Sequence, residues 1–161
     1  MTLDWRAAIW AGILAGVVFM ILEMLLVQFL GEGNMWGPPR MIAAILMGRT
    51  VLPPPATFDA VILIVAMTVH FVLSLIYAFI FGWIVSWWNL AMTGAIISGI
   101  VFGLVIYVVN FYGFTALFPW FAEARNWITI FAHAVFGLIL GAVYEPLARQ
   151  ESGRVVVGGR S

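Results

Sequence analysis

The sequence predicts an all-α membrane protein with four transmembrane helices and a short interfacial helix in the first loop. Composition supports this prediction, because 65% of the 161 residues are hydrophobic and only 9% are charged, whereas soluble domains are nearer half apolar and a quarter charged. Four apolar segments are also each long enough to cross the hydrocarbon core, which takes about 20 helical residues. Since lipid offers the backbone no hydrogen bonds, such segments should be helices.

The four predicted spans form one transmembrane domain over residues 1–147. Their bounds are residues 5–29, 60–85, 90–112 and 127–147. Tryptophan prefers the membrane interface, and the tryptophans fall near the ends of the spans. One side carries Trp5, Trp10, Trp83, Trp87 and Trp88, and the other side carries Trp36, Trp120 and Trp127. We expect Pro146 to end the last span and the aperiodic tail, residues 148–161, to be mobile.

The first loop, residues 31–59, is the longest connection and contains a predicted short helix. Residues 41–48 read as this helix, with Pro38 and Pro39 just before it, where proline suits a first turn. Three prolines at 53–55 then favour an extended return to the second span. Such a helix would lie on the membrane surface, either as a structural cover over the helix ends or as a docking surface for a partner.

Small residues recur along the spans in a pattern that predicts a duplicated two-helix hairpin. Ala8, Gly12 and Gly16 match Ala91, Ala95 and Gly99 at one constant offset. Spans two and four align at another offset, through His70 and His133. Two such halves would have the same orientation in the membrane. The alternative is chance, because alanine and glycine recur in any apolar segment.

Helix packing is predicted to use these small residues, because close backbone approach is a main source of helix association in lipid. The predicted packing positions are Gly12, Gly16, Ser74, Ala78, Gly99, Gly103, Gly137 and Gly141.

The segment His133-Ala-Val-Phe-Gly137-Leu-Ile-Leu-Gly141-Ala-Val-Tyr144 resembles a group of small four-span bacterial inner-membrane proteins, some of which are labelled sodium:proline symporter. The segment that follows His70 is similar, with Ser74 where that group would have glycine. The resemblance implies a four-helix fold in a bacterial inner membrane. It implies no established activity.

Three ionisable residues lie inside predicted spans: Glu23, His70 and His133. Because a charged group costs several kcal/mol at the bilayer centre, such residues suggest function. Counted from the first loop, all three fall in the same leaflet, near Asn110 and Gln28.

Several roles for these three residues remain open from the sequence. His70 and His133 could ligate a b-type haem from both sides, or the three residues together could bind a metal ion. They could also form a proton relay, since histidine titrates near neutral pH. The commonest use of polar residues in helix bundles is structural hydrogen bonding between helices, so no cofactor is the favoured expectation.

The sequence favours a non-enzymatic structural or accessory component of a larger membrane complex, whose partners are the lipid bilayer and other membrane subunits or a second copy. The first alternative is a small proton, ion or solute transporter that uses Glu23, His70 and His133. The second is a haem-binding electron-transfer subunit. Scattered arginines argue against nucleic acid, and four arginines against three favour both termini in the cytoplasm.

Overall fold

The computed structural model describes residues 3–158, with the side chains of residues 3–150. It confirms the all-α membrane fold, because no strand occurs in this part of the chain and four of its helices are long and apolar enough to cross a membrane. These helices are α1 (Trp5–Leu30), α3 (Ala60–Trp88), α4 (Met92–Val108) and α5 (Trp127–Gly158). With the short helices that follow it, α4 belongs to a span that runs over Met92–Ala116.

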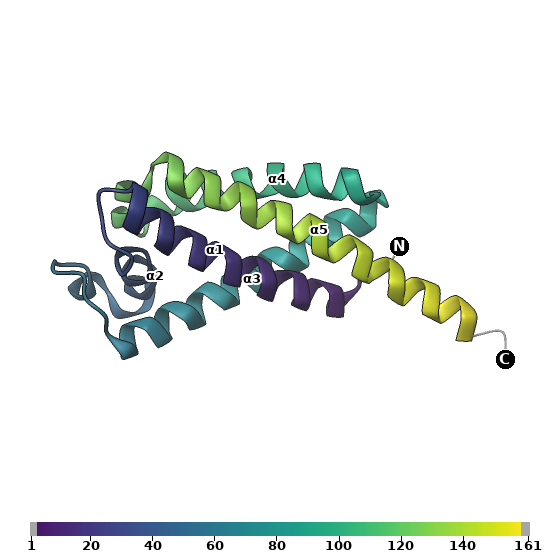
Figure 1. The fold of residues 1–161 in the computed structure, drawn as a ribbon, viewed down its shortest axis with the longest axis horizontal. Helices are drawn as coiled ribbons and strands as arrows, with labels where there is room; N and C mark the ends of the chain where they lie inside the picture. Colours follow the sequence, from purple (N-terminus) through teal and green to yellow (C-terminus); the bar gives the residue numbers. More distant parts are fainter. Residues whose placement is uncertain (1–2, 159–161) are drawn as a thin grey trace.

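The helices α1 and α5 lie side by side in the middle of the bundle (Figure 1). α4 runs along α5, and α3 packs on α1 and crosses the bundle obliquely. Helices that are neighbours in sequence therefore form two hairpins, α1 with α3 and α4 with α5. The hairpins meet mainly through α1 and α5, whereas α3 and α4 make little contact.

Glycines make the α4–α5 crossing possible. A Cβ atom added at Gly99 would overlap the carbonyl of Gly137, and one added at Gly137 would overlap the carbonyl of Gly99. Gly103 is equally close to the carbonyl of His133, and Gly141 to that of Ala95. The two backbones are thus in direct contact, which any side chain at these positions would prevent.

The α1–α3 crossing uses small residues in the same way. Gly12 and Gly16 of α1 face Ser74 and Ala78 of α3, and the Ser74 hydroxyl donates to the carbonyl of Gly12 over 2.7 Å. Positions matched in sequence make matching contacts, since Gly16 packs on Ser74 as Gly99 packs on Gly137. The contacts between the hairpins do not match in this way, because α1 and α5 pack closely while α3 and α4 do not.

The end of the bundle that holds the N-terminus of α1 is closed around Tyr144, a fully buried residue of α5. The backbone N–H of Asp4 donates to its hydroxyl over 3.1 Å, and the hydroxyls of Tyr144 and Ser86 lie 2.9 Å apart. Gly82 leaves room for the aromatic ring. One side chain therefore joins α1, α3 and α5 at this end.

The predicted short helix of the first loop is present as α2 (Gly37–Met47). It begins four residues earlier than expected, because both prolines lie inside its first turn, where no backbone N–H is needed. Arg40 stabilises the loop by donating to the carbonyls of Val51 and Thr57.

Trp120 was expected at the membrane interface, but it is buried and donates its indole N–H to the carbonyl of Met41.

The expectation that Pro146 ends the last span is wrong. Pro146 lies inside α5, which continues to Gly158, so part of the expected tail is helical, and the rest of that tail, residues 159–161, lies outside the described residues. Proline is tolerated inside transmembrane helices where neighbouring helices and side chains support the turn around it. Tyr144 is anchored just before the proline, and Glu145 forms an ion pair with Arg149 across it.

Candidate functional site

A cavity of about 810 Å³ occupies the half of the bundle nearest the first loop. Its inner end reaches Ser74 and Phe136, and its outer end reaches Glu32 and Glu123 in the loops. The walls come from α1, α2, α3 and α5, from the π-helical turn η2 (Val109–Gly113) and from η4 (Pro119–Ala124). The three ionisable residues predicted from the sequence all line it, together with Asn110.

Glu23 is the buried carboxylate of this cavity, and it is only 5% exposed. The Thr129 hydroxyl donates to its Oε1 over 2.8 Å. Its Oε2 is buried without a hydrogen-bond partner among the described residues. Buried polar atoms are nearly always bonded, and leaving one unbonded costs about 1–3 kcal/mol. Oε2 therefore lacks, among the described residues, the donor that a buried acceptor normally has.

His70 is held by α1. Its Nε2 lies 2.9 Å from the carbonyl oxygen of Gly16. Because a carbonyl can only accept, this nitrogen carries the hydrogen, and in the neutral ring Nδ1 is left as an acceptor. The close approach of α3 to α1 at Gly16 brings the imidazole to this carbonyl.

His133 is held within its own helix. Its Nδ1 lies 2.8 Å from the carbonyl of Thr129, one turn earlier in α5. By the same reasoning Nδ1 donates, and Nε2 of the neutral ring is an acceptor. Thr129 thus orients two groups of the cavity, Glu23 through its hydroxyl and His133 through its carbonyl.

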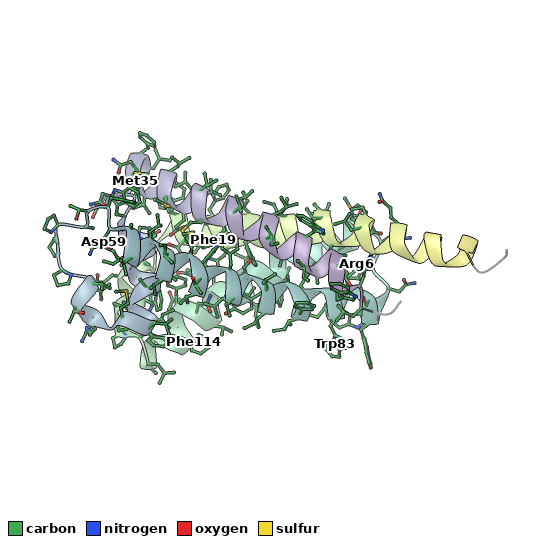
Figure 2. The ribbon with its side chains drawn as sticks, turned by 90° about the horizontal axis from the view of Figure 1, so that it is seen from below. Arg6, Phe19, Met35, Asp59, Trp83 and Phe114 are labelled. Carbon is green, nitrogen blue, oxygen red and sulfur yellow. The ribbon has the colours of Figure 1, made fainter. Side chains whose placement is uncertain are left out.

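Phe19 packs against both imidazoles. Its ring centroid is 5.5 Å from that of His70, nearly parallel to it, and 4.8 Å from that of His133, edge to face. Phe19 is a partly buried residue of α1 and is labelled in Figure 2. A haem held between the histidines would need this space and a free Nε2 on His70, which Gly16 already binds. The residues present do not fit that ligation.

The predicted metal site is not formed either. Among the residues whose side chains the structure describes, no three His, Cys, Asp or Glu side chains come close enough to hold a metal ion. Glu23 and His133 are turned toward Thr129 and His70 toward Gly16, so the three predicted ligands do not converge on one point.

Asn110 and Tyr77 form a second polar contact in the wall, with the Tyr77 hydroxyl donating to Asn110 Oδ1 over 2.7 Å. Asn110 lies in the π-helical turn that ends α4, and such turns occur frequently at functional sites. Gln28, which was expected nearby, instead accepts from the backbone N–H of Met35 at an exposed position outside the cavity.

The cavity is acidic and aromatic. Glu23, Glu32 and Glu123 line it, and neither lysine nor arginine occurs among the described residues of its wall. Its phenylalanines come from α1, α5 and the segment after α4. They are Phe19, Phe111, Phe114, Phe118, Phe121 and Phe136.

The sequence reasoning missed Thr129, Phe19 and Tyr77. Helical spacing could have indicated all three, because residues three, four and seven apart share one face of a helix. Thr129 precedes His133 by four residues, Phe19 precedes Glu23 by four, and Tyr77 follows His70 by seven.

Comparison with models of protein families, with curated proteins and with solved structures found no match to this chain.

Proposed function

We propose that this chain is a small transporter of a bacterial inner membrane that binds a solute inside the bilayer, with Glu23 as the anchoring group and His70 and His133 beside it. The observation that carries the proposal is that Glu23 lines a cavity of about 810 Å³ while its buried Oε2 has no hydrogen-bond partner among the described residues. Binding pockets for drug-sized molecules have volumes of about 300–1,000 Å³. Ionisable groups inside a span commonly mark the path of a substrate or ion, and Glu23 lines this cavity with one of its two carboxylate oxygens bonded only by Thr129.

The shape of the bundle supports this proposal. The cavity reaches the loops at the α2 end, while the opposite end is filled by fully buried side chains, among them Phe81, Val85, Leu140 and Tyr144. Secondary transporters hold their site near the membrane midplane, between repeated halves of the chain, and open it to one side at a time. The matching small-residue contacts in the two hairpins support a duplicated origin of this kind.

Competition for one carboxylate would couple the solute to protons. Glu23 Oε2 accepts either a proton or a donor group of the solute, so each displaces the other. His70 and His133 offer further acceptors in the same wall.

Access to the cavity from the two sides of the membrane tests the transport proposal. The chain has no cysteine, so single cysteines can be placed freely. Met20 lines the cavity and is 4% exposed, whereas its neighbour Ile21 is 55% exposed on the outer face of α1. We expect a small membrane-impermeant thiol reagent to label Met20→Cys from both sides of sealed vesicles, and Ile21→Cys from neither.

Labelling of Met20→Cys from the α2 side alone would contradict transport, and the cavity would then be a binding site that opens to one side of the membrane only. Labelling from neither side would contradict solute access altogether. Because Met20 and Ile21 are adjacent in one helix, they lie at nearly the same depth, and the comparison separates the cavity from the lipid-facing surface.

An accessory role in a larger membrane complex is the second candidate. The observation that favours it is an almost wholly apolar groove of about 490 Å³ between α3 and α4, lined by Trp88, Gly94 and Ser98. Small residues four apart let another helix approach closely, so an apolar transmembrane helix is the partner that this groove would take. Replacing Gly94 and Ser98 together by leucine should then remove a stoichiometric partner after mild extraction, and an unchanged complex would exclude this surface.

A further inference from the structure

We propose that the solute is an organic amine, a cation with at least one N–H group and an aromatic or similarly bulky apolar body. This inference rests on the proposed binding role of the cavity and names the chemical class of its ligand. Three independent properties of the wall support it: its charge, its acceptors and its aromatic rings.

The charge of the wall favours a cation. Glu23, Glu32 and Glu123 line the cavity from its interior to its mouth, with neither lysine nor arginine among the described lining residues. An acidic cleft with apolar walls concentrates cations and repels anions. A carboxylate or phosphate ligand would meet three glutamates, and the described lining residues include neither lysine nor arginine to balance its charge.

The hydrogen-bonding groups of the wall favour a donor. Glu23 Oε2 is a buried acceptor without a partner among the described residues. His70 and His133 each donate to a backbone carbonyl, so the remaining nitrogen of each neutral ring is an acceptor. An ammonium group supplies N–H donors together with a positive charge, and both suit a carboxylate acceptor better than a neutral hydroxyl does.

The aromatic rings favour an organic cation over a bare metal ion. Six phenylalanines line the cavity, and aromatic faces attract ammonium groups as well as apolar bodies. A metal ion would instead need three or more side-chain ligands close together, and the described residues contain no such group. The volume of about 810 Å³ also suits a molecule of drug size.

A matched series of three ligands tests the inference with the unmodified chain in phosphatidylcholine nanodiscs. Diphenylmethylamine, diphenylmethanol and diphenylacetate share one apolar body and differ in the charged or polar group. We expect calorimetric titration, corrected with empty discs, to show the amine binding at least tenfold more tightly than the alcohol, and no binding of the carboxylate. Equal binding of amine and alcohol, or tighter binding of the carboxylate, would overturn the inference.

Variants then locate the recognition. Glu23→Gln should weaken binding of the amine at least tenfold and leave the alcohol unchanged. Glu145→Gln is the matched control, because Glu145 is a buried glutamate of α5 that pairs with Arg149 outside the cavity. An unchanged preference for the amine in Glu23→Gln would contradict the assignment, and the ligand series with the unmodified chain stays decisive if that variant does not fold.

The ammonium could belong to a free solute or to a lipid headgroup. Repeating the titration in discs that contain phosphatidylethanolamine separates these sources. A weaker apparent affinity for the amine would show that the lipid ammonium competes for the same site, and an unchanged affinity would identify a free amine as the ligand. If Met20→Cys is labelled from both sides but no amine binds, only the ligand class is wrong. If Met20→Cys is not labelled at all, the proposed function fails as well.

Discussion

Thr129 connects the polar groups of the cavity although it was not predicted to belong to them. It is 2% exposed, its hydroxyl donates to Glu23 and its carbonyl accepts from His133. Asn126 caps the start of α5 by accepting from the backbone N–H of Thr129. The position of Glu23 therefore depends on a neutral residue of another helix.

Replacing Thr129 by valine tests this dependence. The substitution keeps the shape and removes the donor, so both oxygens of Glu23 would lack a hydrogen bond from the wall. We expect the free energy of unfolding to fall by about 1 kcal/mol, measured by denaturant titration in mixed micelles followed by far-UV circular dichroism. Thr129→Ser should retain most of the stability, because it keeps the hydroxyl.

Thr68→Val is the control for that measurement. Thr68 is exposed, and its hydroxyl donates only to the carbonyl of Ile64 in its own helix. We expect a change within about 0.5 kcal/mol. Equal destabilisation by Thr68→Val and Thr129→Val would show that the hydrogen bond to Glu23 contributes no more to stability than an exposed one.

At the level of the helices, the two hairpins are held by crossings at which backbones touch. In α4 and α5 the glycines leave no room for a Cβ atom, while in α1 and α3 a serine fits because its hydroxyl bonds the facing backbone. Gly12 would place a Cβ atom 2.9 Å from that of Ala78, and Gly16 would place one 2.8 Å from Ser74 Oγ. The α4–α5 crossing should therefore tolerate substitution least.

Gly137→Ala tests the α4–α5 crossing. The added methyl group would overlap the carbonyl of Gly99, so the helices must separate, and we expect a loss of about 1–3 kcal/mol in unfolding free energy. Gly94→Ala is the matched control in α4, because a Cβ atom there meets only the side chain of Leu90 at 3.6 Å. It should be neutral or slightly stabilising, since alanine favours the helix. Equal losses of unfolding free energy in both variants would contradict the close backbone contact between α4 and α5.

At the scale of the whole molecule, the four spans place two sets of loops at opposite ends of the bundle. Figure 2 shows Met35, Asp59 and Phe114 toward one end and Arg6 and Trp83 toward the other. The cavity lies at the first of these ends, and the Tyr144 contacts close the second. We expect the second end to face the cytoplasm, because the sequence has four arginines on the side of the termini and three on the other side.

Single-cysteine labelling checks this topology. Glu32, Ala122 and Thr93 are exposed, the first two in the connections at the cavity end and the third in the first turn of α4 at the opposite end. We expect an impermeant thiol reagent added to intact cells to label Glu32→Cys and Ala122→Cys, and Thr93→Cys only after the membrane is opened. Labelling of Thr93→Cys alone would reverse the orientation, and labelling of Glu32→Cys without Ala122→Cys would contradict four spans.

Hydropathy alone was enough to predict the number of spans, their approximate bounds and the small set of ionisable residues within them. These features are local: an apolar run must be long enough to cross the hydrocarbon core, and a charged group inside it is conspicuous. The positions of Glu23, His70 and His133 in one half of the bundle followed from counting along the spans.

The faces of the helices that meet could not be predicted from the sequence and are known from the fold. In water the apolar face of a helix marks its buried side, but in these spans the lipid-facing and the buried faces are both apolar, so periodicity does not give the rotation of a helix. The structure alone placed Phe19 against both histidines and Thr129 beside Glu23. It also showed that α5 continues beyond Pro146. These outcomes depend on contacts between residues far apart in the chain, which hydropathy does not encode.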